Sequence, residues 1–264
     1  MLQSTLIAAL AGLVSFSSAA PTTIQRRQGG GKRGLAFAKD TQDKANMFTG
    51  SGKISWGYDW EARAQNAPGF AVVPGVEFVP MLHDGGEMFM NAFDSDIQGA
   101  LAAGSRHILS INEPDICCEG CGGACMDVPS TVAAHMAKIQ PIADAHPDVI
   151  IVSPAYSNAG VGAMQEFLGA CSGCRIDHVA THWYGPADVE AFKAHVQNVH
   201  DLTGKPVWVT EFQAQSGDQD QFLRDAVAWL DSTDFVYRYS YFSVEVSLTA
   251  GFSLTSTGDI FANA

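Results

Sequence analysis

The chain has 264 residues, of which 47% are hydrophobic and 16% charged, and its formal net charge is −13. This length and composition can bury the core of one large domain or two small ones. The acidic balance excludes nucleic acid and anionic membranes as partners, because like charges repel, but it is compatible with a neutral polymer. The excess of acidic residues can equally well serve only to keep the protein soluble, so the net charge does not identify a partner.

The N-terminus resembles a secretory signal. Residues 6–14 form a short apolar run and residues 15–20 are small, although no Lys or Arg precedes the run. We expect residues 1–20 to be cleaved as a signal peptide. Residues 21–33 then form a flexible leader or a pro-segment that is trimmed at its dibasic pairs. No stretch is long enough to span a bilayer, so we expect a secreted protein, extracellular or in a cell wall.

From residue 34 onward, eight short runs rich in β-branched and aromatic residues alternate with helical patterns. The predicted strands are 34–38, 53–59, 76–82, 107–112, 149–154, 178–183, 206–210 and 236–242. The predicted helices are 86–103, 129–145, 164–170, 187–202 and 220–230, and the first two intervals are less clear. This alternation predicts an α/β fold with a parallel sheet, a single-domain (β/α)8 TIM barrel over residues 34–264. A doubly wound open sheet is the alternative, but the first strand lacks the Gly-rich nucleotide loop of that fold.

Six cysteines occur in the chain: Cys117, Cys118, Cys121, Cys125, Cys171 and Cys174. An even number in a secreted protein favours disulfides. The alternative is a zinc site, because two Cys-x-x-Cys pairs offer four thiolates. We predict disulfides, with Cys171 paired to Cys174 and the other four paired among themselves. We expect no metal and no organic cofactor.

Chemistry-bearing side chains gather where the predicted strands end, which is where a (β/α)8 barrel has its active site. They are Trp56, Tyr58, Asp59, Trp60, His83, Asp84, Asn112, Glu113, Tyr156, Asn158, His182, Trp183, Tyr184, Glu211, Tyr241, Phe242 and Glu245. Aromatic rings stack on sugars, polar groups bind hydroxyls, and two carboxylates suit glycoside hydrolysis. Taken singly, each residue is equally well a helix cap, a salt-bridge partner or a half-buried aromatic. The combination of Asn112-Glu113 after the fourth strand and Glu211 after the seventh favours a catalytic pair.

Several short motifs carry a family resemblance. They are Trp56-Gly57-Tyr58, Phe78-Val79-Pro80-Met81, Ile111-Asn112-Glu113-Pro114-Asp115, Thr181-His182-Trp183-Tyr184, Val209-Thr210-Glu211-Phe212 and Tyr239-Ser240-Tyr241-Phe242. Together they resemble glycoside hydrolase family 128, a family of fungal and plant-associated β-1,3-glucanases within the retaining (β/α)8 glycosidases. The resemblance extends from about Arg33 to the end of the chain. We expect a departure from relatives in the Cys-rich insert 117–125.

The resemblance implies a role for each matching residue. Glu113 would be the acid/base, Glu211 the nucleophile, and Asn112 would hold the sugar 2-hydroxyl. Tyr184 would lie beside Glu211. The remaining candidates for substrate binding divide into stacking rings, hydroxyl-binding groups and further strand-end tyrosines: Trp56, Tyr58, Trp183 and Phe242; His83 and His182; Tyr156 and Tyr241.

We therefore predict a secreted, monomeric retaining hydrolase of β-1,3-glucan polysaccharide or oligosaccharide. We expect it to be endo-acting, so that it cleaves bonds inside the glucan chain. Its two carboxyl groups should lie about 5–5.5 Å apart. Three alternatives stay open. One is a non-catalytic β-glucan-binding protein on the same barrel, another is a hydrolase of a different β-glycan such as a β-1,4-glucan, and the third is a zinc enzyme that uses the cysteines.

Overall fold

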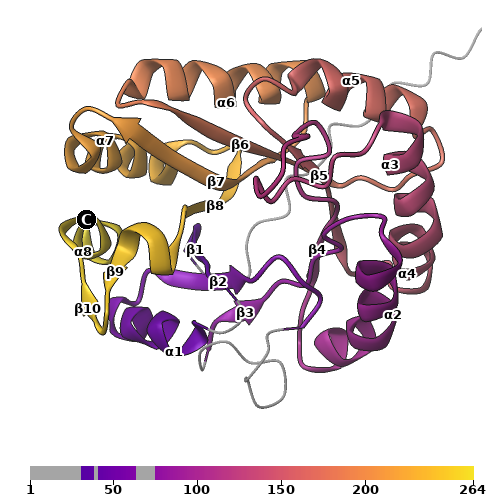
Figure 1. The fold of residues 1–264 in the computed structure, drawn as a ribbon, viewed down its shortest axis with the longest axis horizontal. Coiled ribbons are helices and arrows are strands. Elements are labelled where there is room, and N and C mark those ends of the chain that lie inside the picture. The colour runs from indigo at the N-terminus through magenta and orange to yellow at the C-terminus, as the bar shows by residue number, and fades with distance from the viewer. Residues whose placement is uncertain (1–30, 39–40, 64–74) are drawn as a thin grey trace, which may run out of the picture.

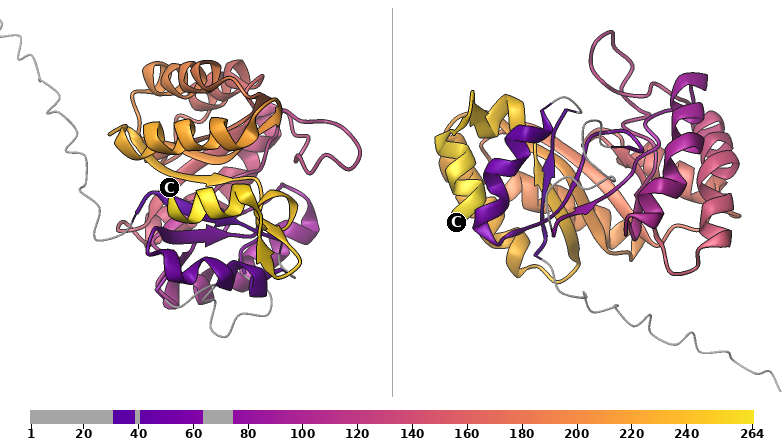
Figure 2. Two further views of the ribbon diagram at one scale, coloured as in Figure 1. Left: turned by 90° about the vertical axis from the view of Figure 1, so that its left-hand side faces the viewer. Right: turned by 90° about the horizontal axis from the view of Figure 1, so that it is seen from below.

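The computed structural model describes residues 31–38, 41–63 and 75–264. Three predicted segments lie outside the described residues. They are the signal peptide, residues 21–30 of the leader, and most of the interval between the predicted strands 53–59 and 76–82. A curled sheet forms the centre of the molecule, and helices surround it (Figures 1 and 2). The strands are β1 (Arg33–Ala36), β2 (Ile54–Tyr58), β3 (Glu77–Phe78), β4 (His107–Leu109), β5 (Ile150–Tyr156), β6 (His178–Pro186), β7 (Val207–Ser216) and β8 (Val236–Tyr241).

The sheet is a closed parallel barrel. Its strand order is β3-β2-β1-β8-β7-β6-β5-β4, and every paired neighbour in it is parallel. An isolated parallel bridge between Met81, after β3, and Leu109 of β4 joins the two ends of this order. The single-domain (β/α)8 fold is therefore confirmed, and each predicted strand has its counterpart.

The helices on the outside are α1 (Gln42–Ala45), α2 (Glu87–Ala102), α3 (Val128–Ala134), α4 (Gln140–Ala145), α5 (Val161–Ala170), α6 (Val189–Thr203), α7 (Gln219–Ser232) and α8 (Ser256–Asn263). A π-helical turn, His135–Ile139, joins α3 to α4, so the predicted helix 129–145 is one continuous helical segment. The turn lies just before Pro141, which lacks an N–H and crowds the carbonyl four residues earlier. None of the helices in the described parts of the chain is long and apolar enough to cross a membrane.

The core has two layers, because side chains of a strand alternate between the barrel interior and the helices. On β7, Trp208 points into the barrel, where it packs with Trp56. Its neighbours Val207 and Val209 point outward and join the larger cluster beneath the helices. This alternation decides which strand-end residues can reach the active-site end of the barrel and which are covered by helices.

Candidate active site

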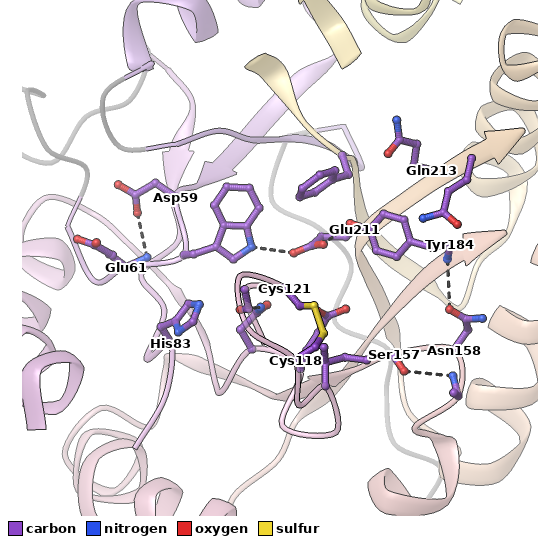
Figure 3. A pocket seen from close by; sticks show the side chains of 18 of the residues that line it. Asp59, Glu61, His83, Cys118, Cys121, Ser157, Asn158, Tyr184, Glu211 and Gln213 are labelled. Carbon is purple, nitrogen blue, oxygen red and sulfur yellow. Dashed lines mark hydrogen bonds between the residues drawn. A yellow bond between two sulfur atoms is a disulfide. The ribbon is translucent and has the colours of Figure 1, made fainter. Parts of the chain in front are cut away.

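A cleft of about 840 Å³ lies at the carboxyl ends of the strands (Figure 3). Its lining includes both predicted catalytic glutamates and side chains that follow most of the barrel strands: Asp59, Trp60, Glu61, His83, Phe89, Asn112, Glu113, Ile116, Cys118, Cys121, Gly122, Ser157, Asn158, Ala159, Tyr184, Glu211, Gln213, Gln215, Phe242 and Glu245. A volume of this size is at the upper end of small-molecule sites and accommodates more than one sugar ring.

Glu113 is fixed by its own backbone before its side chain makes any contact. Its N–H donates to the carbonyl of Ala155 at 2.8 Å, which ties the end of β4 to β5. Its φ is +42°, a left-handed conformation that a non-glycine residue adopts only where its surroundings hold it. The residue is 7% exposed, and its Oε1 lies 2.8 Å from Nδ1 of His182.

Glu211 lies within β7 and accepts hydrogen bonds on both carboxylate oxygens. Trp60 Nε1 donates to Oε1 at 2.7 Å, and the Tyr184 hydroxyl donates to Oε2. The Tyr58 hydroxyl lies 3.4 Å from Oε1. Burial, and then the charge of Glu211, raise the pKa values of Tyr58 and Tyr184. Both phenols therefore stay protonated and remain donors to the carboxylate of Glu211, a residue that is only 4% exposed.

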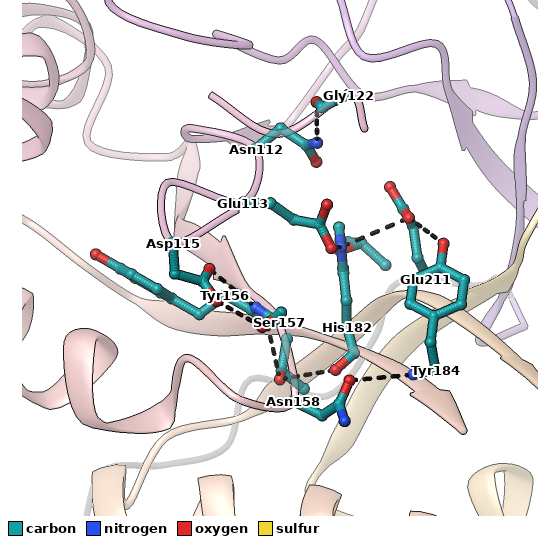
Figure 4. Close-up of polar contacts among 12 residues, drawn as sticks. Asn112, Glu113, Asp115, Gly122, Tyr156, Ser157, Asn158, His182, Tyr184 and Glu211 are labelled. Atoms are coloured by element: carbon teal, nitrogen blue, oxygen red, sulfur yellow. Dashed lines mark hydrogen bonds and ion pairs between the residues drawn. The ribbon is translucent and has the colours of Figure 1, made fainter. Parts of the chain in front are cut away.

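His182 is wholly buried and joins the two glutamates (Figure 4). Its Nδ1 lies 2.8 Å from Glu113 Oε1 and 3.6 Å from Glu211 Oε2, and its Nε2 lies 2.9 Å from Thr210 Oγ1. Burial lowers the pKa of His182, but the charge of Glu211, together with the hydrogen bond to Glu113 and the charge of that carboxylate, outweighs burial and raises it.

The two predicted catalytic side chains lie face to face. One oxygen of Glu113, one of Glu211 and a ring nitrogen of His182 all lie within 4.8 Å of one another. By distance alone the same three groups could hold a metal ion. Both nitrogens of His182 are already engaged with protein partners, however, so the arrangement fits a hydrogen-bonded carboxylate pair better.

Three further predicted residues reach the cleft: Asn112, His83 and Phe242. Asn112 donates from Nδ2 to the carbonyl of Gly122 at 3.1 Å. Its Oδ1 is buried and has no protein partner among the described residues, so it is available to a ligand hydroxyl. The His83 ring stacks on Phe89, with ring centres 4.6 Å apart.

Four predicted sugar-binding aromatics lie in the core instead, which corrects our expectation for them: Trp56, Trp183, Tyr156 and Tyr241, with exposed fractions of 0%, 4%, 1% and 0%. Trp56 points into the barrel below the cleft floor and donates to the carbonyl of Lys32. The other three point outward under the helices. A ring covered on both faces by protein cannot stack on a sugar.

Tyr58 and His182 are also placed differently from our expectation. We expected Tyr58 to stack on sugar and His182 to bind sugar hydroxyls. Both are fully buried, and neither lines the cleft. Their polar atoms contact the glutamates instead.

Gln213 and Gln215 line the cleft although neither is among the residues predicted from the sequence, and Trp60 was placed among the strand-end residues without a binding role. Trp60 has φ +61° and reaches Glu211 from the turn after β2. Strand alternation could have found two of them, because Trp60 is two residues beyond Tyr58 and Gln213 two beyond Glu211. Phe89 lies at the start of α2 and carries no comparable signal.

All six cysteines form disulfides: Cys117–Cys125, Cys118–Cys121 and Cys171–Cys174. The predicted pairing of Cys171 with Cys174, and of the other four among themselves, is confirmed. All six lie in the described part of the chain, so no cysteine thiolate is left there for zinc. Cys118 and Cys121 line the cleft, so the Cys-rich insert forms part of its wall.

Comparison with known proteins agrees with the site. The model of a family described as glycosyl hydrolase catalytic core matches residues 34–261. A solved family 128 (subgroup III) curdlan-specific exo-β-1,3-glucanase from Blastomyces gilchristii, in complex with glucose, is 37% identical, with a TM-score of 0.77. That match covers 88% of this chain and 98% of the other.

Two further proteins are similar over most of this chain. A family 128 (subgroup I) endo-β-1,3-glucanase from Amycolatopsis mediterranei, solved with laminarihexaose, is 25% identical with a TM-score of 0.71, covering 88% of this chain and 99% of that one. Alkali-sensitive linkage protein 1 of Schizosaccharomyces pombe is 28% identical over 84% of this chain, but the chain spans only 40% of that protein's length. By the matched catalytic-core model and its similarity to the Blastomyces structure, this chain belongs to the glycosyl hydrolase catalytic core family and, within the glycosidases, to glycoside hydrolase family 128.

Proposed function

We propose that this protein is a retaining β-1,3-glucanase with Glu113 as acid/base and Glu211 as nucleophile. The observation that carries the proposal is the pair of buried carboxylates, whose nearest oxygens lie within 4.8 Å across the cleft. The B. gilchristii and A. mediterranei relatives are both named β-1,3-glucanases, which supports this linkage for the family member described here.

In the first step Glu113 protonates the glycosidic oxygen while Glu211 attacks the anomeric carbon. The bond to the leaving sugar breaks as the bond to the Glu211 carboxylate forms, which leaves Glu113 ionised. His182 contacts Oε1 of Glu113, so Oε2 is the oxygen that carries the proton towards substrate. Trp60 and Tyr184 hold Glu211 in line for attack.

In the second step Glu113 takes a proton from water, and the resulting hydroxide displaces Glu211 from the anomeric carbon. Two displacements at one carbon restore its configuration. Inverting enzymes need room for a water between the carboxylates and keep them about 6.5–9.5 Å apart. The short approach of Glu113 to Glu211 favours the retaining route.

We also propose that Asn112 binds the 2-hydroxyl through its buried Oδ1, and that His83, Tyr184 and Phe242 contact the glucan. Each of these residues lines the cleft. Endo action is part of the proposal, supported by a cleft whose lining extends from Glu61 after β2 to Gln215 in β7, beyond the two glutamates. A fall in glucan viscosity ahead of reducing-end release supports endo action, and glucose as the sole early product overturns it.

Secretion is the remaining element of the proposed function. All six cysteines are oxidised, as is usual for proteins of oxidising compartments. We expect the protein, acting as a monomer, in the culture medium or cell wall of the producing organism. Its first residue there should lie near position 21, which N-terminal sequencing measures. Recovery only from the cytosol with its thiols reduced contradicts this.

The decisive experiment measures reducing sugar released from a linear β-1,3-glucan and from a β-1,4-glucan. We expect the wild type to act on the β-1,3 polymer alone, and Glu211→Gln to lose activity by about 10³-fold or more. Glu166→Gln is the matched control, because Glu166 is exposed on α5, outside the cleft. A wild type that binds β-1,3-glucan without hydrolysing it favours the non-catalytic binding protein. Activity on the β-1,4 polymer overturns the linkage.

A further inference from the structure

The segment that leads from Glu113 towards α3 carries a loop closed by two disulfides, the cysteine loop, residues 117–125. Cys117 pairs with Cys125 at its base, and Cys118 pairs with Cys121 near its tip. Residues 117–122 are all exposed, so no buried apolar side chain anchors this part of the loop. Its shape therefore depends on the two disulfides and on backbone hydrogen bonds.

One side of the cysteine loop is a wall of the cleft. Cys118, Cys121 and Gly122 line the same space as Glu113 and Glu211, and the Cys118–Cys121 disulfide faces that space (Figure 3). A sugar chain bound across the two glutamates must run past this disulfide. The Cys118–Cys121 bridge therefore has the position of an affinity determinant.

The other side of the cysteine loop is bonded to the segment that presents the proposed acid/base. The carbonyl of Gly122 accepts from Asn112 Nδ2 at 3.1 Å, which leaves the unpartnered Oδ1 for substrate (Figure 4). The N–H of Ala124 lies 2.9 Å from the carbonyl of Asn112 and 3.2 Å from that of Glu113. The cysteine loop thus contacts both Asn112, the proposed ligand of the sugar 2-hydroxyl, and Glu113, the proposed acid that protonates the leaving group.

The backbone here is held in conformations that need such support. Glu113 has φ +42° and Cys125 has φ +47°, and neither is glycine. Gly123 packs so closely that a Cβ there would lie 2.6 Å from Cβ of Ile116 and 3.0 Å from the carbonyl oxygen of Glu113. The Cys117–Cys125 bridge closes the loop at the point where these contacts converge.

We propose that the cysteine loop is a disulfide-dependent positioning element. The Cys117–Cys125 bridge fixes Asn112 and Glu113 for catalysis, and the Cys118–Cys121 bridge shapes the wall against which the glucan lies. Reduction of the exposed disulfides therefore lowers turnover and affinity reversibly. The turnover part rests on the proposed function, whereas the affinity part requires only that the cleft binds β-1,3-glucan.

The test compares three double variants by kcat and KM, and by affinity for laminarihexaose measured in a Glu211→Gln background that does not hydrolyse it. Thermal unfolding of each variant confirms folding. In Cys117→Ser/Cys125→Ser we expect kcat to fall by about tenfold to 100-fold, the effect of a small misplacement of a reacting group. In Cys118→Ser/Cys121→Ser we expect KM and Kd to rise about tenfold with kcat unchanged, the signature of lost uniform binding. Cys171→Ser/Cys174→Ser is the matched control, because it has the same spacing and lies outside the cleft, and it should match the wild type.

Two additional measurements cover loss of folding in the variants. Gly123→Ala disturbs the loop without touching a disulfide and should also lower kcat. Wild type treated with dithiothreitol should lose activity and regain it on reoxidation, as should the control variant. Full activity of wild type whose loop thiols are shown by mass spectrometry to be reduced overturns the proposal. Folded loop variants that match the control overturn it as well.

Failure of the proposed function gives a different pattern. A wild type without hydrolytic activity removes the proposed function, yet the laminarihexaose affinities of the same variants still test the wall. Equal affinity in wild type and Cys118→Ser/Cys121→Ser then overturns the affinity part. A rise in Kd confined to the loop variants supports it.

Discussion

At the scale of single residues, the site gives the two glutamates different neighbours. Glu211 accepts from an indole and a phenol, whereas the hydrogen-bond partner of the Glu113 carboxylate among the described residues is an imidazole. The phenol of Tyr184 cannot ionise at ordinary pH, because burial and the Glu211 charge raise its pKa. Glu211 therefore keeps fixed donors, as a nucleophile needs, and Glu113 faces a group that can share a proton with it, as an acid/base needs.

Removal of the Tyr184 hydroxyl should affect catalysis more than binding. Tyr184→Phe leaves Oε2 of Glu211 without its phenol donor, so we expect kcat on β-1,3-glucan to fall by about 10- to 100-fold with little change in KM. Tyr241→Phe is the matched control, because its ring lies in the core outside the cleft. Equal losses in the two variants would show that the Tyr184 hydroxyl has no special role.

Chemical rescue can distinguish the proposed acid/base, Glu113, from the proposed nucleophile, Glu211. Glu113→Ala should lose activity on polymer but still form the glycosyl-enzyme from a β-laminaribioside with a dinitrophenolate leaving group, which needs no acid. Azide should then restore turnover of that substrate and yield a β-glycosyl azide, identified by NMR. An α-azide from this variant, or a β-azide from Glu211→Ala, would exchange or remove the proposed roles.

At the scale of elements, strand order could be predicted from the sequence, and side-chain direction only in part. Glu113 and Glu211 meet because each follows a strand that ends at the same rim. Trp183 could have been excluded, since it adjoins His182 and alternation forbids that both face inward. Tyr156 could not, because an irregularity in the β5–β6 pairing between Val152 and Ala155 reverses the alternation before it.

Loops and turns limit the remaining part of the sequence-based prediction, because their residues follow no repeating pattern. Strand alternation could place Trp60 on the cleft side, but the left-handed turn that brings its indole to Glu211 is one that no local preference of tryptophan predicts. The two-stranded β9 (Thr249–Ala250) and β10 (Ser253–Leu254) hairpin is too short to show alternation. Cys-rich composition indicated disulfides, but only the folded loop reveals that one of them borders the cleft.

An ion cluster lies at the opposite end of the barrel, at or near the first residues of three strands. Glu77 begins β3 and contacts His107 of β4 at 2.8 Å and Arg238 of β8 at 2.7 Å. Burial alone would raise the pKa of Glu77, but the hydrogen bond from His107 and the charge of Arg238 outweigh burial and lower it from 4.5 to about 2. Because the folded pKa is the lower one, this carboxylate stabilises the fold above pH 4.5, and that contribution is lost as pH falls towards 2.

We expect Glu77→Gln to lower the free energy of unfolding by about 3 kcal/mol at neutral pH, because it leaves the half-buried guanidinium of Arg238 without its anion. The variant should also lose less stability than wild type between pH 4.5 and 2. Urea unfolding at several pH values measures both effects. Glu190→Gln, which breaks an exposed pair with Lys193 on α6, should change stability by under about 1 kcal/mol. Parallel pH curves for Glu77→Gln and wild type would contradict this account.

At the scale of the whole molecule, the protein is strongly acidic, whereas the polymer that we propose it binds is uncharged. The net charge is −13, and the cleft itself contributes Asp59, Glu61 and Glu245 besides the two central glutamates. Such a field would repel an anionic polysaccharide and concentrate cations, but it exerts no net force on a neutral glucan. The binding energy must then come from stacking, hydrogen bonds and shape, none of which is screened by salt.

Salt dependence of affinity therefore distinguishes a neutral ligand from a charged one. Between about 50 and 500 mM NaCl the Debye length shortens more than twofold, so a charged ligand would change its affinity strongly over this range. We expect Kd for laminarihexaose, measured by calorimetry with Glu211→Gln so that the ligand is not hydrolysed, to change by less than about twofold. Thermal unfolding in the same buffers verifies that the fold is intact. An affinity that changes steeply with salt would contradict this account, because laminarihexaose is uncharged and its binding would then depend on the charges of the cleft itself.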